Sequence, residues 1–498
     1  MVARLLTEEL LAQLPAATPL GDLPAEVGLV VCDSRRVGRG DVFVAIQGLR
    51  EDGHAYIAQA RERGAALVVG ERLDALSGGP SLLVPDSRRA LGLLAAAASG
   101  HPSKHLRMIG VTGTNGKTST THLLASILEA SGTPTAVIGT IGVYLGGERQ
   151  DLARTTPDPG DLQPLLAHLL GRGARAVVME VSSHALALDR VVGCEFDGAV
   201  FTNLTQDHLD FHRTIESYRS AKLRLFTSLG GSYTGAPKAG RKWAAINIGD
   251  PSGPLFMRRT PVRTVTFGPG GEVQAEAVEC DRDGSRFVLR GPFGLRPVRL
   301  RPPGRFYALN ALAAAAAAWA EGVSVDAIVA GLEAVRGVPG RFEAVTGPWP
   351  FLVVVDYAHT PDGMEKLLTA AREVTPGRVF LLTGAGGDRD RGKRAPMGEA
   401  AARGADFVAL TADNPRSEDP ERIMDQLEEG VARARKRPLV RDVDRRRAIE
   451  AVMRQARAGD TVVLAGKGHE TYQIVGDHVF PFDDRVMARE VLEEMGPW

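Results

Sequence analysis

The chain has 498 residues, of which 44% are hydrophobic, 24% charged and 5% aromatic, a composition that is typical of soluble globular proteins and excludes a disordered or fibrous chain. The 60 Lys and Arg residues balance 60 Asp and Glu residues, so the overall charge disfavours nucleic acid or an acidic membrane as a partner. Three dispersed cysteines predict no disulfide framework or zinc site, and no apolar run is long enough to span a bilayer, so we expect a cytoplasmic protein.

The order of the predicted elements indicates an α/β protein of three domains, covering residues 1–103, 104–337 and 338–498. Strand-like runs alternate with helical stretches in the central domain, which favours a P-loop-type parallel sheet, and short runs between Gly and Pro turns at 262–301 predict a small antiparallel patch. Alternation resumes after the turn cluster at 337–340 and predicts a C-terminal Rossmann-like α/β domain. The predicted strands are 28–32, 41–46, 66–69, 107–111, 135–138, 176–181, 199–202, 352–356, 378–382, 406–410 and 461–465. The predicted helices are 56–63, 88–98, 118–130, 215–226 and 308–319.

The strongest local signal is a glycine-rich turn between the strand predicted at 107–111 and the helix predicted at 118–130. Backbone N–H groups of such a turn bind phosphate oxygens, and the sequence that opens the helix would place Lys117 on the β- and γ-phosphates and the Thr118 hydroxyl on Mg²⁺. The strict pattern of this motif is not met because Val111 stands where its first glycine belongs, and a turn that binds nothing is the alternative. Only nine of the 60 basic residues are lysines, so a lysine here indicates a chemical role. The predicted phosphate-binding residues are Gly113, Thr114, Asn115, Gly116, Lys117 and Thr118.

Polar side chains follow two further predicted strands of this domain. Glu180 lies at the end of the strand at 176–181, and His208 follows the next strand. Because ligands of open α/β sheets bind at the carboxyl ends of the strands, we expect Glu180 to reach a Mg²⁺ ion held by Thr118. Taken singly, each of these residues could be a helix cap or a satisfied loop residue, and Lys222 a solvated helix lysine. Their joint occurrence beside the phosphate loop favours a site.

Several motifs in a fixed order resemble those of the Mur ligase family, which makes bacterial cell-wall precursors. The segment 112–118 resembles the ATP loop of that family and 180–184 its metal-binding strand, and the likeness runs from about residue 28 to about residue 485. It implies a carbamate, derived from CO2, on Lys222, since a free ammonium would repel Mg²⁺ whereas a carbamate supplies oxygen ligands. The implied metal ligands are Thr118, Glu180, His208 and carbamylated Lys222, and the further ATP-binding residues are Asn310, Arg341, Asp356 and His359. The residues expected to be catalytic are Lys117, Glu180, His208 and Lys222.

Within the family, the chain most resembles the enzymes that add a diamino acid to UDP-MurNAc-L-Ala-D-Glu. The segments that carry this likeness are 33–35, 47–48 and 52–54 for the uridine nucleotide, 155–157 for the substrate loop, and 386–394, 413–416 and 466–470 for the amino-acid domain. The implied substrate-binding residues are Ser34, Gln47, Thr155, Thr156, Ser182, Arg190, Arg389, Asp413, Asn414, Pro415, Arg416, Gly466 and Glu470.

The implied reaction is the formation of an amide bond driven by ATP, in which a carboxylate is phosphorylated to an acyl phosphate that the incoming amine attacks. The segment 413–416 resembles the form used with meso-diaminopimelate, whose distal carboxylate would pair with the planar fork of Arg416. Arg389 would be a second cationic contact, and Glu470 would accept from the distal ammonium. The alternatives are L-lysine or L-ornithine as the amino acid, another Mur ligase, an enzyme like folylpolyglutamate synthetase, and a nucleotide-binding protein without enzyme activity. A monomer is expected.

Overall fold

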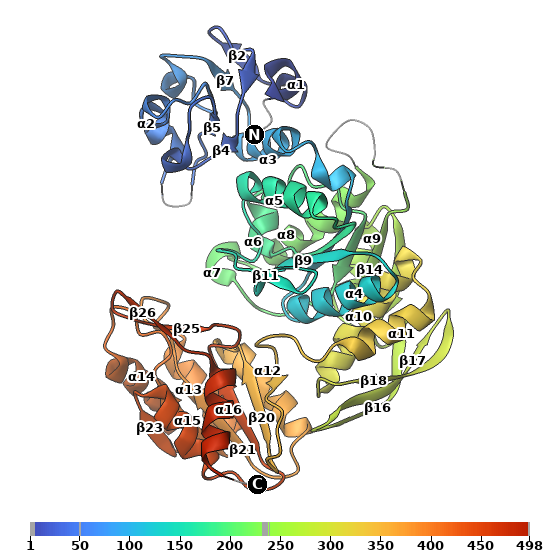
Figure 1. The fold of residues 1–498 in the computed structure, drawn as a ribbon, viewed down its shortest axis with the longest axis vertical. Coiled ribbons are helices and arrows are strands. Elements are labelled where there is room, and N and C mark those ends of the chain that lie inside the picture. The colour runs from blue at the N-terminus through green and yellow to red at the C-terminus, as the bar shows by residue number, and fades with distance from the viewer. Residues whose placement is uncertain (1–4, 49–50, 232–237, 239, 497–498) are drawn as a thin grey trace. The chain divides into compact units, whose positions relative to one another are not determined.

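The structure is a computed structural model, and it describes residues 5–48, 51–231, 238 and 240–496 (Figure 1). Three α/β sheets of five, eight and six strands confirm the predicted fold class of three α/β domains. Two compact units divide the chain, and they are described separately below. The first comprises residues 1–274, 291–293 and 311–331, and the second 275–290, 294–310 and 332–498. The domain boundaries at residues 103 and 337 stay predictions.

The first sheet has the strand order β2-β7-β6-β5-β4, in which the last four strands are parallel and β2 is antiparallel. Helix α3 begins after Asp86, whose carboxylate accepts the N–H of Arg89 at 2.9 Å and so caps the first turn. The predicted strands and helices of this region are all present, whereas β2 and β7 were not predicted. The elements are β1 (Leu5–Leu6), α1 (Thr7–Ala12), β2 (Thr18–Leu20), β3 (Glu26–Val27), β4 (Val30–Val31), β5 (Val42–Val44), α2 (Ile57–Glu62), β6 (Leu67–Gly70), β7 (Ser81–Leu83) and α3 (Ser87–Ala98).

The eight-stranded sheet has the order β11-β10-β9-β12-β8-β13-β14-β15, and it is parallel from β9 to β15. Strands β10 and β11 form an antiparallel hairpin on its edge. The elements are β8 (Arg107–Thr112), α4 (Lys117–Ala130), β9 (Thr135–Gly139), β10 (Gly142–Leu145), β11 (Glu148–Gln150), α5 (Pro159–Gly171), β12 (Ala176–Glu180), α6 (Ser183–Ala187), β13 (Gly198–Phe201), α7 (Leu209–His212), α8 (Ile215–Thr227), β14 (Trp243–Asn247), α9 (Gly253–Arg259) and β15 (Arg263–Phe267).

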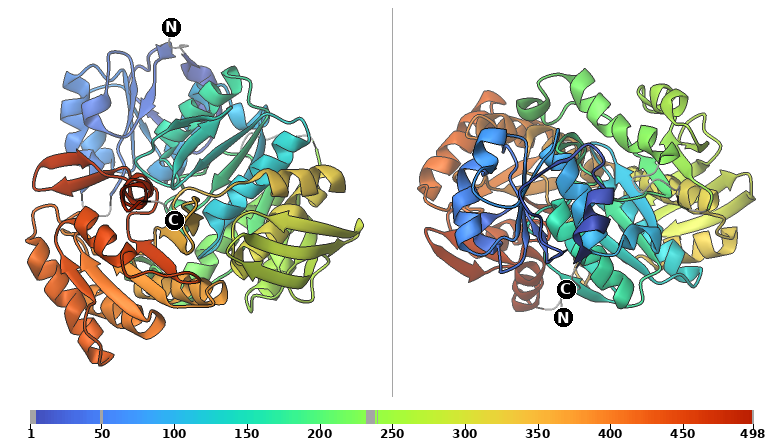
Figure 2. Two further views of the ribbon diagram at one scale, coloured as in Figure 1. Left: turned by 60° about the horizontal axis from the view of Figure 1, so that its bottom comes forward. Right: turned by 90° about the horizontal axis from the view of Figure 1, so that it is seen from above.

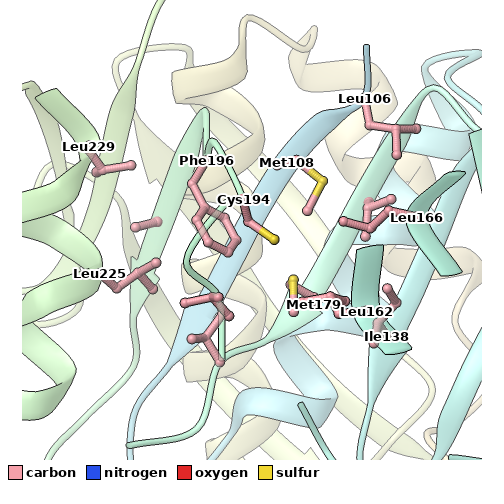
Figure 3. Close-up of a cluster of buried hydrophobic side chains, with 14 of the residues drawn as sticks. Leu106, Met108, Ile138, Leu162, Leu166, Met179, Cys194, Phe196, Leu225 and Leu229 are labelled. Atoms are coloured by element: carbon pink, nitrogen blue, oxygen red, sulfur yellow. The ribbon is translucent and has the colours of Figure 1, made fainter. Parts of the chain in front are cut away.

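The central strands of this sheet are apolar along their whole length because both faces of the sheet are buried. A parallel sheet is covered by helices on both faces, so successive side chains of a strand are all buried. Met108 of β8 and Met179 of β12 belong to a buried cluster with Leu162 and Leu166 of α5 (Figure 3). Leu225 of α8 belongs to the same cluster. The apolar runs therefore predicted these strands well, because burial on both faces leaves no alternation to misread.

The predicted antiparallel patch at 262–301 begins later than expected. Residues 263–267 form β15, which pairs in parallel with β14 in the large sheet, because Val265 and Phe267 are buried there. The patch itself is a three-stranded sheet in the order β16-β17-β18, yellow-green in Figure 2. Connections of two residues join its strands, which is possible only between antiparallel neighbours. The elements are β16 (Gln274–Asp281), β17 (Gly284–Gly291) and β18 (Gly294–Leu300), followed by α10 (Arg305–Glu321) and α11 (Val325–Ala334).

The six-stranded sheet of the second unit has the order β19-β20-β24-β21-β22-β23, parallel except for β19. A separate antiparallel hairpin, β25 with β26, follows β24 in the chain. No helix of the described residues is long and apolar enough to cross a membrane. The elements are β19 (Glu343–Ala344), β20 (Leu352–Asp356), α12 (Pro361–Glu373), β21 (Val379–Thr383), α13 (Arg394–Gly404), β22 (Phe407–Thr411), α14 (Pro420–Arg433), β23 (Val440–Asp442), α15 (Arg445–Met453), β24 (Thr461–Ala465), β25 (Tyr472–Val475), β26 (His478–Pro481) and α16 (Asp484–Glu494).

A buried ion pair joins α15 to α16 in this unit. Arg445 donates through Nε and Nη2 to the two carboxylate oxygens of Asp484, at 2.7 and 2.6 Å, and both side chains are 0% exposed. We expect Arg445→Met to lower the free energy of unfolding by about 3–5 kcal/mol, because it leaves an uncompensated buried carboxylate. The double change Arg445→Met with Asp484→Leu should cost much less. Urea denaturation of the three proteins measures this.

The exposed pair Arg446–Glu494 provides the control for that experiment. Arg446→Met should leave the denaturation midpoint nearly unchanged, because exposed ion pairs contribute little. A double variant that is no more stable than Arg445→Met alone would contradict the prediction.

Candidate active site

The candidate site of the first unit lies at the carboxyl edge of the large sheet. Thr140, Glu180, Gly113 and Asn203 lie at or just beyond the ends of β9, β12, β8 and β13, which are neighbours in the sheet and run in parallel. Because the carboxyl ends of parallel strands meet at one edge, residues far apart in the sequence converge there. The predicted phosphate and metal residues of these strands are therefore brought together.

The phosphate loop is fixed to the segment that follows β13. Asn203 accepts the N–H of Asn115 through its side-chain oxygen at 3.0 Å and the N–H of Thr114 through its carbonyl at 2.9 Å. Gly113 is required by close approach, since a Cβ there would lie 1.8 Å from Oγ1 of Thr202. Helix α4 begins directly after the loop, and the N–H groups of its first turn have no acceptor within the helix. Such a helix start, preceded by a glycine-rich turn, can bind phosphate oxygens.

Two lysine side chains meet one carbonyl of this loop. Lys117 donates to the carbonyl oxygens of Gly113 at 3.0 Å and Thr114 at 2.9 Å, and Lys222 donates to that of Gly113 at 2.8 Å. Lys222 is only 1% exposed, and its Nζ lies 4.4 Å from the ring centroid of Tyr218. Burial, together with the charge of Lys117, holds the pKa of Lys222 well below its usual range. A lowered pKa increases the fraction of the neutral amine, which is the nucleophilic form.

Glu180 presents an oriented carboxylate at the same edge. It is 1% exposed, and its oxygens accept the backbone N–H of Thr140 at 2.8 Å and the Thr140 hydroxyl at 3.1 Å. The hydroxyl of Thr155 lies 3.1 Å from that of Thr140. Since the Thr140 hydrogen is used on Glu180, Thr155 is the donor between them. Thr140 was missed in the sequence, although its position directly after β9 is the signal that identified Glu180.

The other predicted substrate residues of this region are connected to one another by hydrogen bonds. The Thr156 hydroxyl donates to the Glu180 carbonyl at 2.9 Å and accepts the N–H of Ser182 at 3.2 Å, and Ser182 caps α6. Arg190 donates to the Thr156 carbonyl at 3.4 Å and pairs with Asp158 at 2.8 Å. The structure therefore brings Thr155, Thr156, Ser182 and Arg190 together, and their contact with substrate stays a prediction.

Three histidines gather close to Lys222. The ring centroid of His184 lies 4.8 Å from that of His208 and 5.5 Å from that of His212. Burial and the two neighbouring rings lower the pKa of His184 to about 4, and burial also lowers the pKa of His208. The neutral imidazole is the form that binds metals. His212 was missed in the sequence. Among the described residues, no three or more His, Cys, Asp or Glu side chains converge as a metal site.

Ser34 and Gln47 lie beyond the carboxyl ends of β4 and β5, which are adjacent parallel strands of the first sheet. The Ser34 hydroxyl is buried and donates to Gln59 at 2.7 Å, and the Gln47 carbonyl accepts from Arg88 at 2.7 Å. They share one sheet edge, as a binding site in an α/β fold requires. Their contact with a uridine nucleotide stays a prediction.

The second unit repeats this arrangement. The segments that begin at Asp356, Gly386, Asp413 and Gly466 follow β20, β21, β22 and β24, four parallel neighbours in the six-stranded sheet. Gly466 has φ +111°, and a Cβ at this position would lie 2.5 Å from Oδ2 of Asp413. The two loops thus pack so closely that only glycine fits between them.

The predicted amino-acid residues of this edge form a connected group. Asn414 is buried and donates to Oε2 of Glu470 at 2.8 Å. Burial raises the pKa of Glu470, and the nearby carboxylate of Asp413 adds to this effect. Lys467 lies within the same group, although the sequence had not assigned it to the site.

Arg416 and Arg389 come from two neighbouring loops. Arg416 has φ +52° and donates to the Gly387 carbonyl at 2.8 Å, while Arg389 is exposed and donates to the carbonyl of the residue before it. The Pro415 carbonyl accepts the N–H of Glu418 at 3.1 Å. The guanidinium of Arg416 is held at the base of one loop and leaves further N–H groups for an anionic ligand.

The ATP-binding residues predicted in the second unit are mostly engaged locally. Asn310 is buried in α10, and the guanidinium of Arg341 lies 5.2 Å from the ring centroid of Tyr357. The carboxylate of Asp356 accepts two backbone N–H groups at 2.7 Å each. Nδ1 of His359 lies 2.8 Å from the Tyr357 carbonyl. These contacts order the linker and the loop after β20, and the role in ATP binding stays a prediction.

Comparison with known proteins gives a consistent result along the chain. Three family models match: "Mur ligase family, catalytic domain" at residues 26–101, "Mur ligase middle domain" at 111–318, and "Mur ligase, glutamate ligase domain" at 340–468. A relative from Syntrophomonas wolfei subsp. wolfei, named UDP-N-acetylmuramoyl-L-alanyl-D-glutamate–2,6-diaminopimelate ligase, is 45% identical over 97% of this chain and 98% of its own length.

Two solved structures resemble the fold. A UDP-N-acetylmuramoyl-L-alanyl-D-glutamate–2,6-diaminopimelate ligase has a TM-score of 0.69 and 33% identity, and the match covers 96% of this chain and 97% of that one. The UDP-N-acetylmuramoylalanyl-D-glutamyl-2,6-diaminopimelate–D-alanyl-D-alanyl ligase from Acinetobacter baumannii has a TM-score of 0.64 over 99% of both chains. Its identity is 22%, so this second likeness concerns the fold alone.

Proposed function

The chain belongs to the Mur ligase family, and on that premise we propose that it is the member that joins meso-diaminopimelate to the D-Glu of UDP-MurNAc-L-Ala-D-Glu. It is an acid–amino-acid ligase that uses ATP, and its product is a precursor of peptidoglycan. A cytoplasmic location and a monomeric state are part of the proposal.

One observation carries the choice of amino acid. A carboxylate, Glu470, and a guanidinium, Arg416, are held in loops that follow β24 and β22, two parallel strands of one sheet with β21 between them, and Asn414, from the same loop as Arg416, donates to Glu470. The distal end of meso-diaminopimelate has one ammonium and one carboxylate, so each finds a group of opposite charge. L-Lysine and L-ornithine have the ammonium but no carboxylate for Arg416 to pair with, which disfavours them.

The first unit supplies the chemistry of activation. An oxygen of the D-Glu carboxylate attacks the γ-phosphorus of ATP, the bond to ADP breaks, and an acyl phosphate forms. The amine of the diamino acid then forms the C–N bond, and phosphate leaves. The N–H groups at the start of α4 and the ammonium of Lys117 would neutralise the charge that the phosphoryl group carries during transfer.

The residues present fit a divalent cation. Glu180 is a buried, oriented carboxylate, and burial lowers the pKa of His208, which favours the neutral imidazole. Lys222 is a buried amine whose pKa is lowered by burial, as a reaction with CO2 requires. Thr118 and Glu180 would hold one Mg²⁺ ion, and His208 and carbamylated Lys222 would hold a second. When bound, these ions would neutralise charge on the phosphate oxygens. The carbamate converts the amine among these residues into an oxygen ligand.

A competition assay tests the amino acid and the activity together. With ATP and UDP-MurNAc-L-Ala-D-Glu, we expect phosphate release only when a diamino acid is added. When equal concentrations of meso-diaminopimelate, L-lysine and L-ornithine compete, the product mass should show diaminopimelate preferred by roughly thirtyfold or more, the value of a lost buried charge pair.

The outcomes separate the alternatives. A product that contains mainly lysine or ornithine would refute the assignment of the amino acid but retain the ligase. Absence of phosphate release under all conditions would refute the ligase and favour a nucleotide-binding protein. ATP turnover with a folate in place of the muramoyl peptide would indicate an enzyme like folylpolyglutamate synthetase.

A further inference from the structure

We propose that Lys467 is a positioning residue of the amino-acid site, whose buried ammonium fixes the Glu470 carboxylate and the Asn414 amide in the arrangement that receives the distal ammonium of the substrate. This inference rests on the proposed function of the site, and it adds a residue that is not among the proposed substrate contacts.

The first observation is the complete burial of a charged side chain. Lys467 is 0% exposed, and its Nζ lies 3.4 Å from Oδ1 of Asn414 and 3.4 Å from Oε2 of Glu470. The ring of Tyr472 covers it, with the centroid 5.7 Å from Nζ. A buried ammonium is costly unless it is paired with an anion, so Lys467 and Glu470 depend on one another.

The second observation is the orientation of Asn414. The backbone N–H of Ile474 donates to Oδ1 of Asn414 at 2.9 Å, and this bond identifies the oxygen side of the amide. Lys467 lies on the same oxygen side, so the amide nitrogen must point to Glu470, to which it donates at 2.8 Å. Lys467 and Asn414 both donate to Oε2 of Glu470. The other carboxylate oxygen, Oε1, is therefore the one that would accept from a ligand.

The third observation is the balance of charge in the group. The carboxylates of Asp413 and Glu470 lie near one another, and the ammonium of Lys467 pairs with Oε2 of Glu470 at 3.4 Å. Without Lys467 the two carboxylates would repel one another, and Glu470 would bind a proton more readily and lose its value as an acceptor.

The glycines on either side explain how a lysine reaches this position. Gly466 and Gly468 have φ values of +111° and +54°, and the turn that they allow aims the intervening side chain into the protein. A Cβ at Gly468 would lie 2.6 Å from Cβ of Tyr357, so the turn is closely packed and Lys467 cannot swing outward without opening it.

The test is the change Lys467→Met, which keeps the length of the side chain and removes its charge. We expect the KM for diaminopimelate to rise by roughly tenfold or more, as for a lost hydrogen bond to a charged group, with the KM for ATP unchanged. In a Glu470→Gln background, the same change should have less than about a twofold further effect, because Lys467 acts through Glu470. Lys366→Met, at an exposed lysine of the same unit, is the control.

The outcomes keep this inference separate from the proposed function. If the wild-type enzyme does not use diaminopimelate, the proposed function fails. If it does and Lys467→Met has a wild-type KM for diaminopimelate, this inference alone is overturned. Effects of the two changes that simply multiply, or a KM for ATP that rises equally, would indicate a general structural role and also overturn it. If Lys467→Met does not fold, Lys467→Gln, which retains an N–H donor, is judged by the same criteria.

Discussion

Replacing Lys222 by alanine is expected to lower the ligase turnover roughly a hundredfold or more, the usual cost of removing one preorganised charge-stabilising group. The buried amine of Lys222 lies on the carbonyl of Gly113 next to Lys117, and burial lowers the pKa of this amine well below its usual range. A neutral amine can attack CO2: a C–N bond forms, the nitrogen loses a proton, and the resulting carbamate is an anion. The site thereby exchanges an amine beside Lys117 for oxygen ligands to Mg²⁺.

The experiment compares steady-state turnover of the two proteins with and without added bicarbonate. Bicarbonate should raise the activity of the CO2-depleted wild type but not that of Lys222→Ala, whereas short carboxylic acids should restore part of the activity of the variant by replacing the carbamate. Lys242→Ala, at a partly exposed lysine of the same unit, is the control and should behave as wild type. Full activity of Lys222→Ala, or no dependence of the wild type on CO2, would falsify the carbamate.

Arg416→Lys is expected to raise the KM for diaminopimelate by roughly thirtyfold or more, although it keeps the positive charge. The planar guanidinium can donate in parallel to both oxygens of the distal carboxylate, and a lysine ammonium cannot. Arg416 also donates to the Gly387 carbonyl at 2.8 Å, so its fork is already fixed on one side. Arg416→Ala, which also removes the charge, should have the larger effect.

The binding of ATP and of the uridine nucleotide should be unaffected by either change, because Arg416 belongs to the amino-acid site. The measurement is the KM for each substrate, and Arg422→Ala on α14 is the control, since that side chain is 85% exposed. If the KM for diaminopimelate does not change in Arg416→Lys, Arg416 has only a structural role in the loop after β22. A KM for L-lysine that falls while that for diaminopimelate rises would show that Arg416 selects the substrate.

Some features of the site were predictable because they depend on local patterns. Glu180 and Asp413 each follow an apolar run, and in a parallel sheet the ends of such runs share one edge. The same reasoning could have found Thr140 after β9, which orients Glu180. Lys467 was recognised in a motif, but nothing in the sequence distinguishes a lysine that points inward from one that points to solvent.

Other features depend on contacts between distant segments and were missed or misplaced. Strand β15 was assigned to the antiparallel patch because its residues are followed by Gly and Pro turns, yet its partner is β14 of the parallel sheet. His212 has no recognisable spacing relative to His184, and only the packing of α7 against α6 and α8 brings their rings together. Sequence distance does not measure distance in space once a crossover helix intervenes.

The sequence by itself determined the α/β class, the phosphate loop and the family, because these depend on periodicity and on short motifs whose backbone geometry is local. The tertiary structure decided which side chains are buried and which donors they meet. Lys222 and Lys467 illustrate the difference, since both stand in recognisable motifs but only folding removes them from water. A charge that has lost its hydration must either be neutralised or find a partner of opposite charge. Burial therefore lowers the pKa of the Lys222 amine, whereas the buried ammonium of Lys467 pairs with Glu470.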